Sequence, residues 1–188
     1  GTNGIEFFMP GVHSDVGGSY HATETENFIV NQGSPSDIKA DRQALINENW
    51  YTANELIYSE DPTYGRRGDV ISTTAKIEAN RGGIKNYYCN IPLKLMAKYA
   101  REEGIPIEKG LEIRANKAIE KDPDLQELDS NIFSYMVANR KDYKAEAPLL
   151  KKIRHKYMHM SAKYEMGLKP RFEQINGVKK RYRQPFDG

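Results

Sequence analysis

The sequence predicts an α-rich α/β fold with several helices, a few short strands and a C-terminal hairpin. Apolar residues recur at helical spacing over 38–58, 92–104, 124–139 and 147–163. Residues 5–9 and 70–77 are rich in aromatic or β-branched side chains, a composition typical of strands. Asn176-Gly177 lies between two extended runs near the C-terminus, and this pair accepts the positive φ angles of a tight hairpin turn.

Glycine, proline and serine residues mark the ends of these elements. Ser36-Asp37 can cap the helix over 38–58, and Pro10-Gly11 ends the strand over 5–9. Pro92 suits the first turn of a helix, because its missing N–H is not needed there. Gly82-Gly83 is expected to end the strand that begins at Val70. The rest is predicted as loops over 12–20, 21–35 and 59–69 and an extended piece over 84–89.

Length and composition exclude several classes of protein. The 188 residues are enough for one domain, which we expect to span 1–188. The 28 basic and 26 acidic residues give a net charge of +2, so we expect no nucleic acid partner. The single cysteine, Cys89, excludes an internal disulfide and a CxxC zinc site. We find neither a signal peptide nor an apolar run of the ~18 residues that a membrane span needs.

The densest group of reactive side chains follows the strand predicted over 5–9. His13, Ser14 and Asp15 stand within three residues, followed by Gly17-Gly18. In α/β enzymes the reactive groups gather at the carboxyl ends of strands, and a histidine there can act as a general base. The alternative is a glycine-rich turn whose polar side chains satisfy the local backbone.

The string FFMPGVHSDVGGSY over 7–20 resembles a signature of the class 1 phospholipase effectors of type VI secretion systems. Two further segments are similar to this family in the expected order, at 90–100 and at the His-x-Ser element of 157–162. The resemblance implies the C-terminal portion of an α/β-hydrolase-like fold. It also implies a bacterial lipid-ester hydrolase with a Ser-His-Asp triad and a phospholipid or other ester substrate.

Carried over to this sequence, the resemblance makes His13 the candidate triad histidine and Asp15 a second candidate, either for catalysis or for shaping the turn. Gly11, Gly17 and Gly18 would shape the loop. Ser14 is not expected to be the nucleophile, because it lacks the G-x-S-x-G elbow.

No G-x-S-x-G occurs anywhere in the 188 residues. We therefore expect a C-terminal part of such a hydrolase, inactive in isolation, whose parent acts in the bacterial cytoplasm or is delivered by a type VI secretion system. The mechanism implies no metal and no organic cofactor. The alternative function is a non-catalytic interaction or membrane-docking module of the same family.

Three weaker patterns remain. His155 and His159 stand four residues apart on a predicted helix, but Lys156 replaces the glutamate of H-E-x-x-H, so a metal site is disfavoured. Basic residues concentrate in the last quarter and could touch an anionic membrane surface, although a solvated face is the simpler interpretation. If residues 5–9 lack neighbouring strands, self-association through this edge is expected.

Overall fold

The computed structural model describes residues 9–137, 147–164, 169–176 and 178–181. The chain divides into two compact units. Unit 1 comprises residues 1–24 and 82–159, and unit 2 comprises residues 25–81 and 160–188. The expectation that 1–188 is one domain from a larger hydrolase stays a prediction.

Most strands lie in the first half of the described chain, and a run of helices follows before the C-terminal hairpin. The order is α1 (His13–Gly17), β1 (Thr23–Gly33), α2 (Pro35–Asn47), β2 (Leu56–Tyr64), β3 (Val70–Lys85), the 3-10 helix η1 (Asn86–Cys89), α3 (Asn90–Glu102), α4 (Lys109–Ile119), α5 (Pro123–Ile132), the π-helical turn η2 (Phe133–Val137), α6 (Ala147–Tyr157), β4 (Phe172–Ile175) and β5 (Val178–Arg181). The mixed α/β class expected from the sequence is confirmed. None of the helices in the described part of the chain has the length and apolar composition that crossing a membrane requires.

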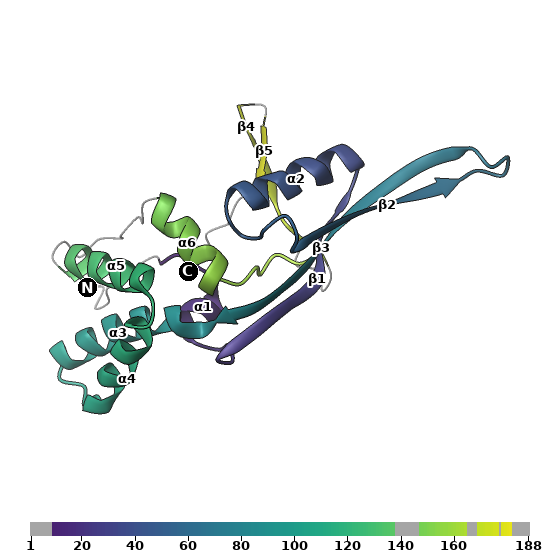
Figure 1. The fold of residues 1–188 in the computed structure, drawn as a ribbon. Coiled ribbons are helices and arrows are strands. Elements are labelled where there is room, and N and C mark those ends of the chain that lie inside the picture. The colour runs from purple at the N-terminus through teal and green to yellow at the C-terminus, as the bar shows by residue number, and fades with distance from the viewer. Residues whose placement is uncertain (1–8, 138–146, 165–168, 177, 182–188) are drawn as a thin grey trace. The chain divides into compact units, whose positions relative to one another are not determined.

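Unit 1 is a helical layer in which α3, α4, α5 and α6 pack in succession (Figure 1). The helices bury one apolar stripe each, including Leu95 of α3, Leu128 of α5 and Ile153 of α6. The short helix α1 packs against η1 and α3. Tyr88 of η1 is buried, and its hydroxyl donates to the carbonyl oxygen of Pro10 at 2.7 Å. These contacts hold the segment around α1 on the helical layer.

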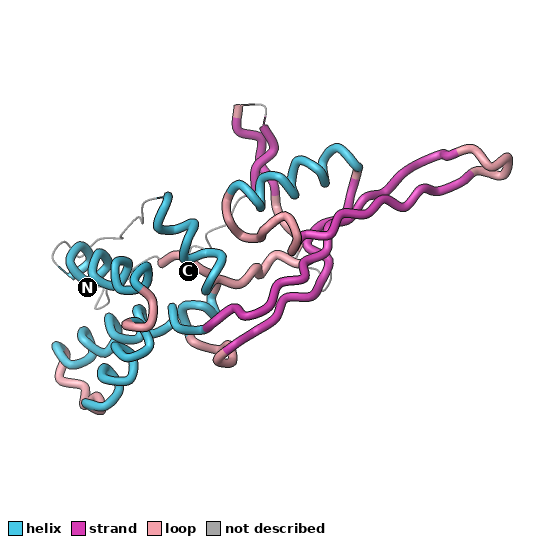
Figure 2. The backbone as a smooth tube through the Cα atoms, in the orientation of Figure 1, coloured by secondary structure: helices cyan, strands magenta, loops and turns pink. Residues whose placement is uncertain are grey.

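Unit 2 contains β2 and most of β1 and β3, which form a three-stranded sheet with the order β1-β3-β2. Its buried core includes Val30 of β1, Ile38 and Leu45 of α2, and Leu56 and Ile77 of the β2–β3 pair. Strands β2 and β3 are antiparallel, and together they extend beyond the end of β1 as a two-stranded arm (Figure 2).

The C-terminal hairpin predicted at Asn176-Gly177 is confirmed. Strands β4 and β5 pair in antiparallel register, and Asn176 in the turn has a φ angle of 53°. The hairpin is tied to α2 through Arg181, whose guanidinium donates to both carboxylate oxygens of Asp41 at 2.7 Å.

Two segments predicted as loops are strands in the structure, for different reasons. Residues 21–35, expected as a polar loop, contain the eleven-residue strand β1. Its polar residues Glu26 and Asn31 are buried with partners, Arg81 for Glu26 and Asp41 for Asn31. The loop predicted over 59–69 is mostly β2, which tolerates Pro62 because it is an edge strand that needs no N–H there.

The helix predicted over 38–58 and the strand predicted over 70–77 also differ from the structure. The helix α2 ends at Asn47, because Asn49 adopts a left-handed φ of 56° and the chain turns into β2. Strand β3 is longer than predicted, since it continues through Gly82-Gly83 to Lys85. The extended piece predicted over 84–89 is the end of β3 followed by the 3-10 helix η1.

The helices of the second half follow the sequence pattern more closely. The helix with Pro92 in its first turn is α3, as predicted. The helix predicted over 124–139 is α5 continued by the π-helical turn η2, and residues 138–139 lie outside the described residues. The last helix ends at Tyr157 rather than 163, and α4 was not predicted. The strand over 5–9, and self-association through it, fall outside the described residues except for Met9, which lies in no regular element.

Candidate active site

The signature segment after Pro10 folds into a helical turn, where a loop over 12–20 was expected. Helix α1 begins after Val12, whose N–H donates to Oδ2 of Asp15 at 3.0 Å. A carboxylate at this position satisfies a backbone donor that the first turn of a helix leaves free. The helix ends at Gly18, which has a φ of 73° and donates its N–H to the carbonyl oxygen of Ser14. The result is a rigid frame around Asp15.

Within this frame Asp15 faces a histidine that is 144 residues away in the sequence. The side chains of Asp15 and His159 are 1% and 5% exposed. Nδ1 of His159 lies 2.7 Å from Oδ1 of Asp15, and the backbone N–H of His159 donates to Oδ2 at 3.1 Å. Both residues belong to unit 1. The structure therefore places Asp15 of the signature in contact with His159 of the His-x-Ser element.

The tautomer of His159 follows from what Asp15 can accept. A carboxylate that takes two backbone N–H groups acts as an acceptor only, so the proton shared at 2.7 Å belongs to Nδ1 of the imidazole. Nε2 then carries the free lone pair. It is buried, and it has no hydrogen-bond partner among the described residues. An imidazole held in this way can take a proton at Nε2 while the carboxylate stabilises the charge.

The face of the imidazole is covered by the last residue of the signature. The ring of Tyr20 stacks on His159 with centroids 3.5 Å apart and an angle of 20° between the planes. The three residues Asp15, Tyr20 and His159 thus form one group in unit 1.

The three glycines of the segment differ in how strongly the fold requires them. Gly11 has a φ of 103°, and a Cβ there would come within 3.1 Å of the Cβ of Asp15. Gly18 has a left-handed φ of 73°. At Gly17 a Cβ would meet nothing within 4 Å. Backbone geometry therefore favours glycine at positions 11 and 18.

His13, the first candidate for the triad histidine, lies at the start of α1 and is exposed. Its imidazole makes no hydrogen bond or ion pair with the residues that the structure describes. Asp15 contacts His159 instead. The sequence did contain a signal for His159, since the His-x-Ser element was part of the resemblance, but its pairing with Asp15 depends on tertiary structure.

The two remaining patterns are not supported as sites. His155 lies in α6 and His159 follows its end, so the two histidines do not share a helix. Within the described ranges no group of three or more His, Cys, Asp or Glu side chains could hold a metal ion. Several basic residues of the last quarter are paired with carboxylates, namely Lys152, Lys156, Lys179 and Arg181. Arg183, another basic residue of the last quarter, lies outside the described residues.

Comparison with known proteins relates this fold to a solved structure. A scan against protein-family models finds no match, and a search of curated proteins finds none either. Among solved structures, the chain matches the Tle1 effector bound to the VgrG spike from the type VI secretion system. The match has a TM-score of 0.55 at 20% sequence identity and covers 88% of this chain.

The match covers only 37% of the effector's chain, so it concerns a part of that protein. At this level of identity the likeness is one of fold. The resemblance inferred from the sequence is confirmed to that extent: the chain shares its α/β fold with a part of a type VI secretion effector.

Proposed function

We propose that this chain supplies the base and the acid of a Ser-His-Asp lipid-ester hydrolase, with His159 as the base and Asp15 as the acid. The observation that carries the proposal is the buried imidazole of His159, with Nδ1 on Asp15 and Nε2 without a partner among the described residues. The nucleophilic serine would come from a part of the protein outside this sequence, since no G-x-S-x-G elbow occurs in it.

In this mechanism the serine hydroxyl attacks the ester carbonyl carbon and its proton moves to Nε2 of His159. The resulting imidazolium is stabilised by the carboxylate of Asp15. Collapse of the tetrahedral intermediate breaks the bond to the leaving alcohol, which takes the proton back from Nε2. A water molecule then repeats the sequence on the acyl-enzyme and regenerates the serine. No metal or organic cofactor takes part.

His159 is a better candidate than His13 on physical grounds. A general base of a triad needs a fixed orientation, and His159 has two fixed contacts, with Asp15 and with Tyr20. His13 is exposed, and its imidazole has no partner among the described residues that would fix its tautomer.

Phospholipids are the proposed substrate class. The support is the resemblance of the signature and the fold shared with part of a type VI secretion effector. The same support suggests delivery by a type VI secretion system.

The test is the activity of the full-length gene product that carries these residues, on phospholipid vesicles. We expect His159→Ala to lower kcat by ~10⁴-fold or more, because the members of a triad act as a unit. His13→Ala is the matched control and is expected to keep its activity. Loss of activity in His13→Ala together with normal turnover in His159→Ala would reverse the assignment.

A second candidate function has one observation in its favour. The Tle1 effector of the matched structure is bound to a protein, the VgrG spike. This chain could therefore serve as a protein-binding module. A full-length product without lipase activity that co-purifies with a spike protein would favour this function over hydrolysis.

A further inference from the structure

Tyr20 contacts His159 but has no step of its own in the proposed mechanism. Its ring lies flat on the imidazole of His159, with 3.5 Å between the centroids. Asp15 holds the edge of the imidazole at Nδ1, and Tyr20 holds its face. A contact at one edge leaves the ring free to tilt about the hydrogen bond, whereas a second contact on the face removes that freedom.

The backbone around Tyr20 is fixed independently of the stacking. Gly18 turns the chain in the left-handed conformation, two residues before Tyr20. The side-chain amide of Asn86 in η1 donates to the carbonyl oxygen of Tyr20 at 3.1 Å. The backbone N–H of Asn86 donates to the carbonyl oxygen of Ala22 at 3.4 Å. The ring of Tyr20 is therefore presented to His159 by a frame that would survive a change of its side chain.

We propose that Tyr20 is a positioning residue that fixes the orientation of the His159 imidazole and stabilises its protonated form through the aromatic face. The role in catalysis rests on the proposed function. When Nε2 takes the proton from the nucleophile, the ring becomes a cation, and an aromatic face attracts a cation stacked on it. The attraction is absent from the neutral ring, so Tyr20 favours the transition state over the ground state.

The first arm of the test is NMR spectroscopy of the 188-residue chain. In the stacked geometry the ring current of Tyr20 shifts the carbon-bound protons of the His159 imidazole upfield. We expect this shift to disappear in Tyr20→Leu and Tyr20→Met and to persist in Tyr20→Phe. Tyr64→Leu, which removes a 61% exposed tyrosine of β2, is the matched control and leaves the shift unchanged. An upfield shift that persists in Tyr20→Leu or Tyr20→Met overturns the role of Tyr20.

The second arm is kinetics of the full-length product. We expect Tyr20→Leu to lower kcat by between about 3-fold and 30-fold with little change in KM, and Tyr20→Phe to restore kcat. A fall in Tyr20→Phe as large as in Tyr20→Leu would point to the hydroxyl group and overturn the proposal, as would full activity in Tyr20→Leu. The variant His159→Ala distinguishes failure of the proposed function. Undiminished turnover in that variant overturns the hydrolase mechanism, whereas the NMR result still decides whether Tyr20 stacks on the imidazole.

Discussion

Two carboxylates, one in each unit, are buried to a similar degree but have different side-chain partners. Asp15 in unit 1 is 1% exposed, and Glu26 in unit 2 is 5% exposed. Each accepts a hydrogen bond from a backbone N–H just after α6, Asp15 from His159 and Glu26 from Met160. They differ in the side chain that balances their charge, which is an imidazole for Asp15 and a guanidinium for Glu26.

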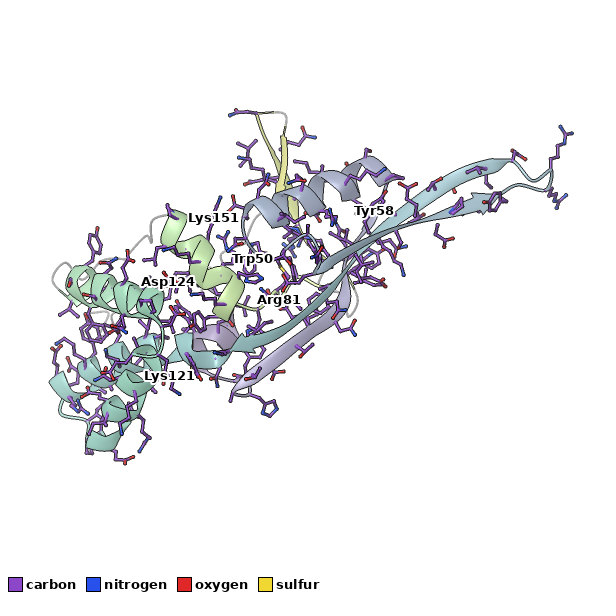
Figure 3. All side chains as sticks on the ribbon, in the orientation of Figure 1. Trp50, Tyr58, Arg81, Lys121, Asp124 and Lys151 are labelled. Carbon is purple, nitrogen blue, oxygen red and sulfur yellow. The ribbon has the colours of Figure 1, made fainter. Side chains whose placement is uncertain are left out.

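Both carboxylate oxygens of Glu26 have hydrogen-bond partners. Oε2 lies 2.9 Å from Nη2 of Arg81 and accepts from the hydroxyl of Tyr51 at 2.7 Å, while Oε1 takes the N–H of Met160. Arg81 is itself fixed, since Nη1 donates to the carbonyl oxygen of Trp50 at 2.7 Å, and the two residues lie close together in Figure 3. Burial raises the pKa of Tyr51 far above its ordinary value, and the nearby charge of Glu26 adds to this rise. This tyrosine therefore stays protonated and remains a donor.

The comparison distinguishes a buried carboxylate that stabilises the fold from one that can support proton transfer. Arginine keeps its proton in proteins, so the pair of Glu26 and Arg81 cannot exchange it and serves stability. An imidazole can gain or lose a proton near neutral pH, and Nε2 of His159 has no partner among the described residues. The pair of Asp15 and His159 is therefore suited to proton transfer.

The largest expected effect is on activity, at Asp15. In the full-length product we expect Asp15→Asn to lower kcat by ~10⁴-fold, because an amide at this position favours the wrong tautomer of His159. The measurement is kcat on one phospholipid substrate, with the exposed Asp61→Asn on β2 as the control. Unchanged turnover in Asp15→Asn would mean that Asp15 only shapes the turn around α1.

The next effect is on stability, at Arg81. We expect Arg81→Met to lower the free energy of unfolding by about 3–5 kcal/mol, because it leaves the buried charge of Glu26 without its cation. Urea denaturation of the 188-residue chain measures this loss. The double variant with Glu26→Gln is expected to recover part of it, since the uncompensated charge is then gone. A loss below 1 kcal/mol in the single variant would show that the pair is not needed for stability.

The same comparison shows why the sequence predicted some elements and missed others. Helix α3 and the hairpin of β4 and β5 were predictable because their signals are local: Pro92 in the first turn and Asn176-Gly177 between the strands. Strand β1 was missed because Glu26 is polar, and its burial is explained by partners far along the chain, such as Arg81, 55 residues further on.

In the candidate site, too, the sequence predicted one part and missed another. Asp15 was found because the signature around it is contiguous in the sequence. The pairing of Asp15 with His159 could not be predicted from spacing, because they are 144 positions apart and no periodic signal in the sequence between them brings them together. The stacking of Tyr20 on His159 could not be predicted either, because it depends on where η1 holds the backbone of Tyr20.

A third carboxylate, Asp124, sharpens the comparison because it is paired but less buried. Its side chain is 15% exposed and accepts from Nζ of Lys156 at 2.7 Å and from Nζ of Lys152 at 3.1 Å. The hydrogen bond from Lys156 lowers the pKa of Asp124, against the opposing effect of burial. Since the pKa is lower in the folded state than in the unfolded state, the pair stabilises the fold above pH ~4. This contribution is lost as the pH falls through the folded pKa.

We therefore expect the free energy of unfolding of the 188-residue chain to fall more steeply below pH 4 than that of Lys156→Met. At pH 6 the substitution is expected to cost only about 0.5 kcal/mol, because Lys156 is 43% exposed and solvent screens the pair. Urea denaturation of both proteins at pH 6 and at pH 3 measures the two differences. If burial determines how much an ion pair contributes to stability, Lys156→Met must lower the free energy of unfolding far less than Arg81→Met does. Equal costs at the two positions would contradict the distinction between buried and exposed pairs on which the assignment of Glu26 to stability depends.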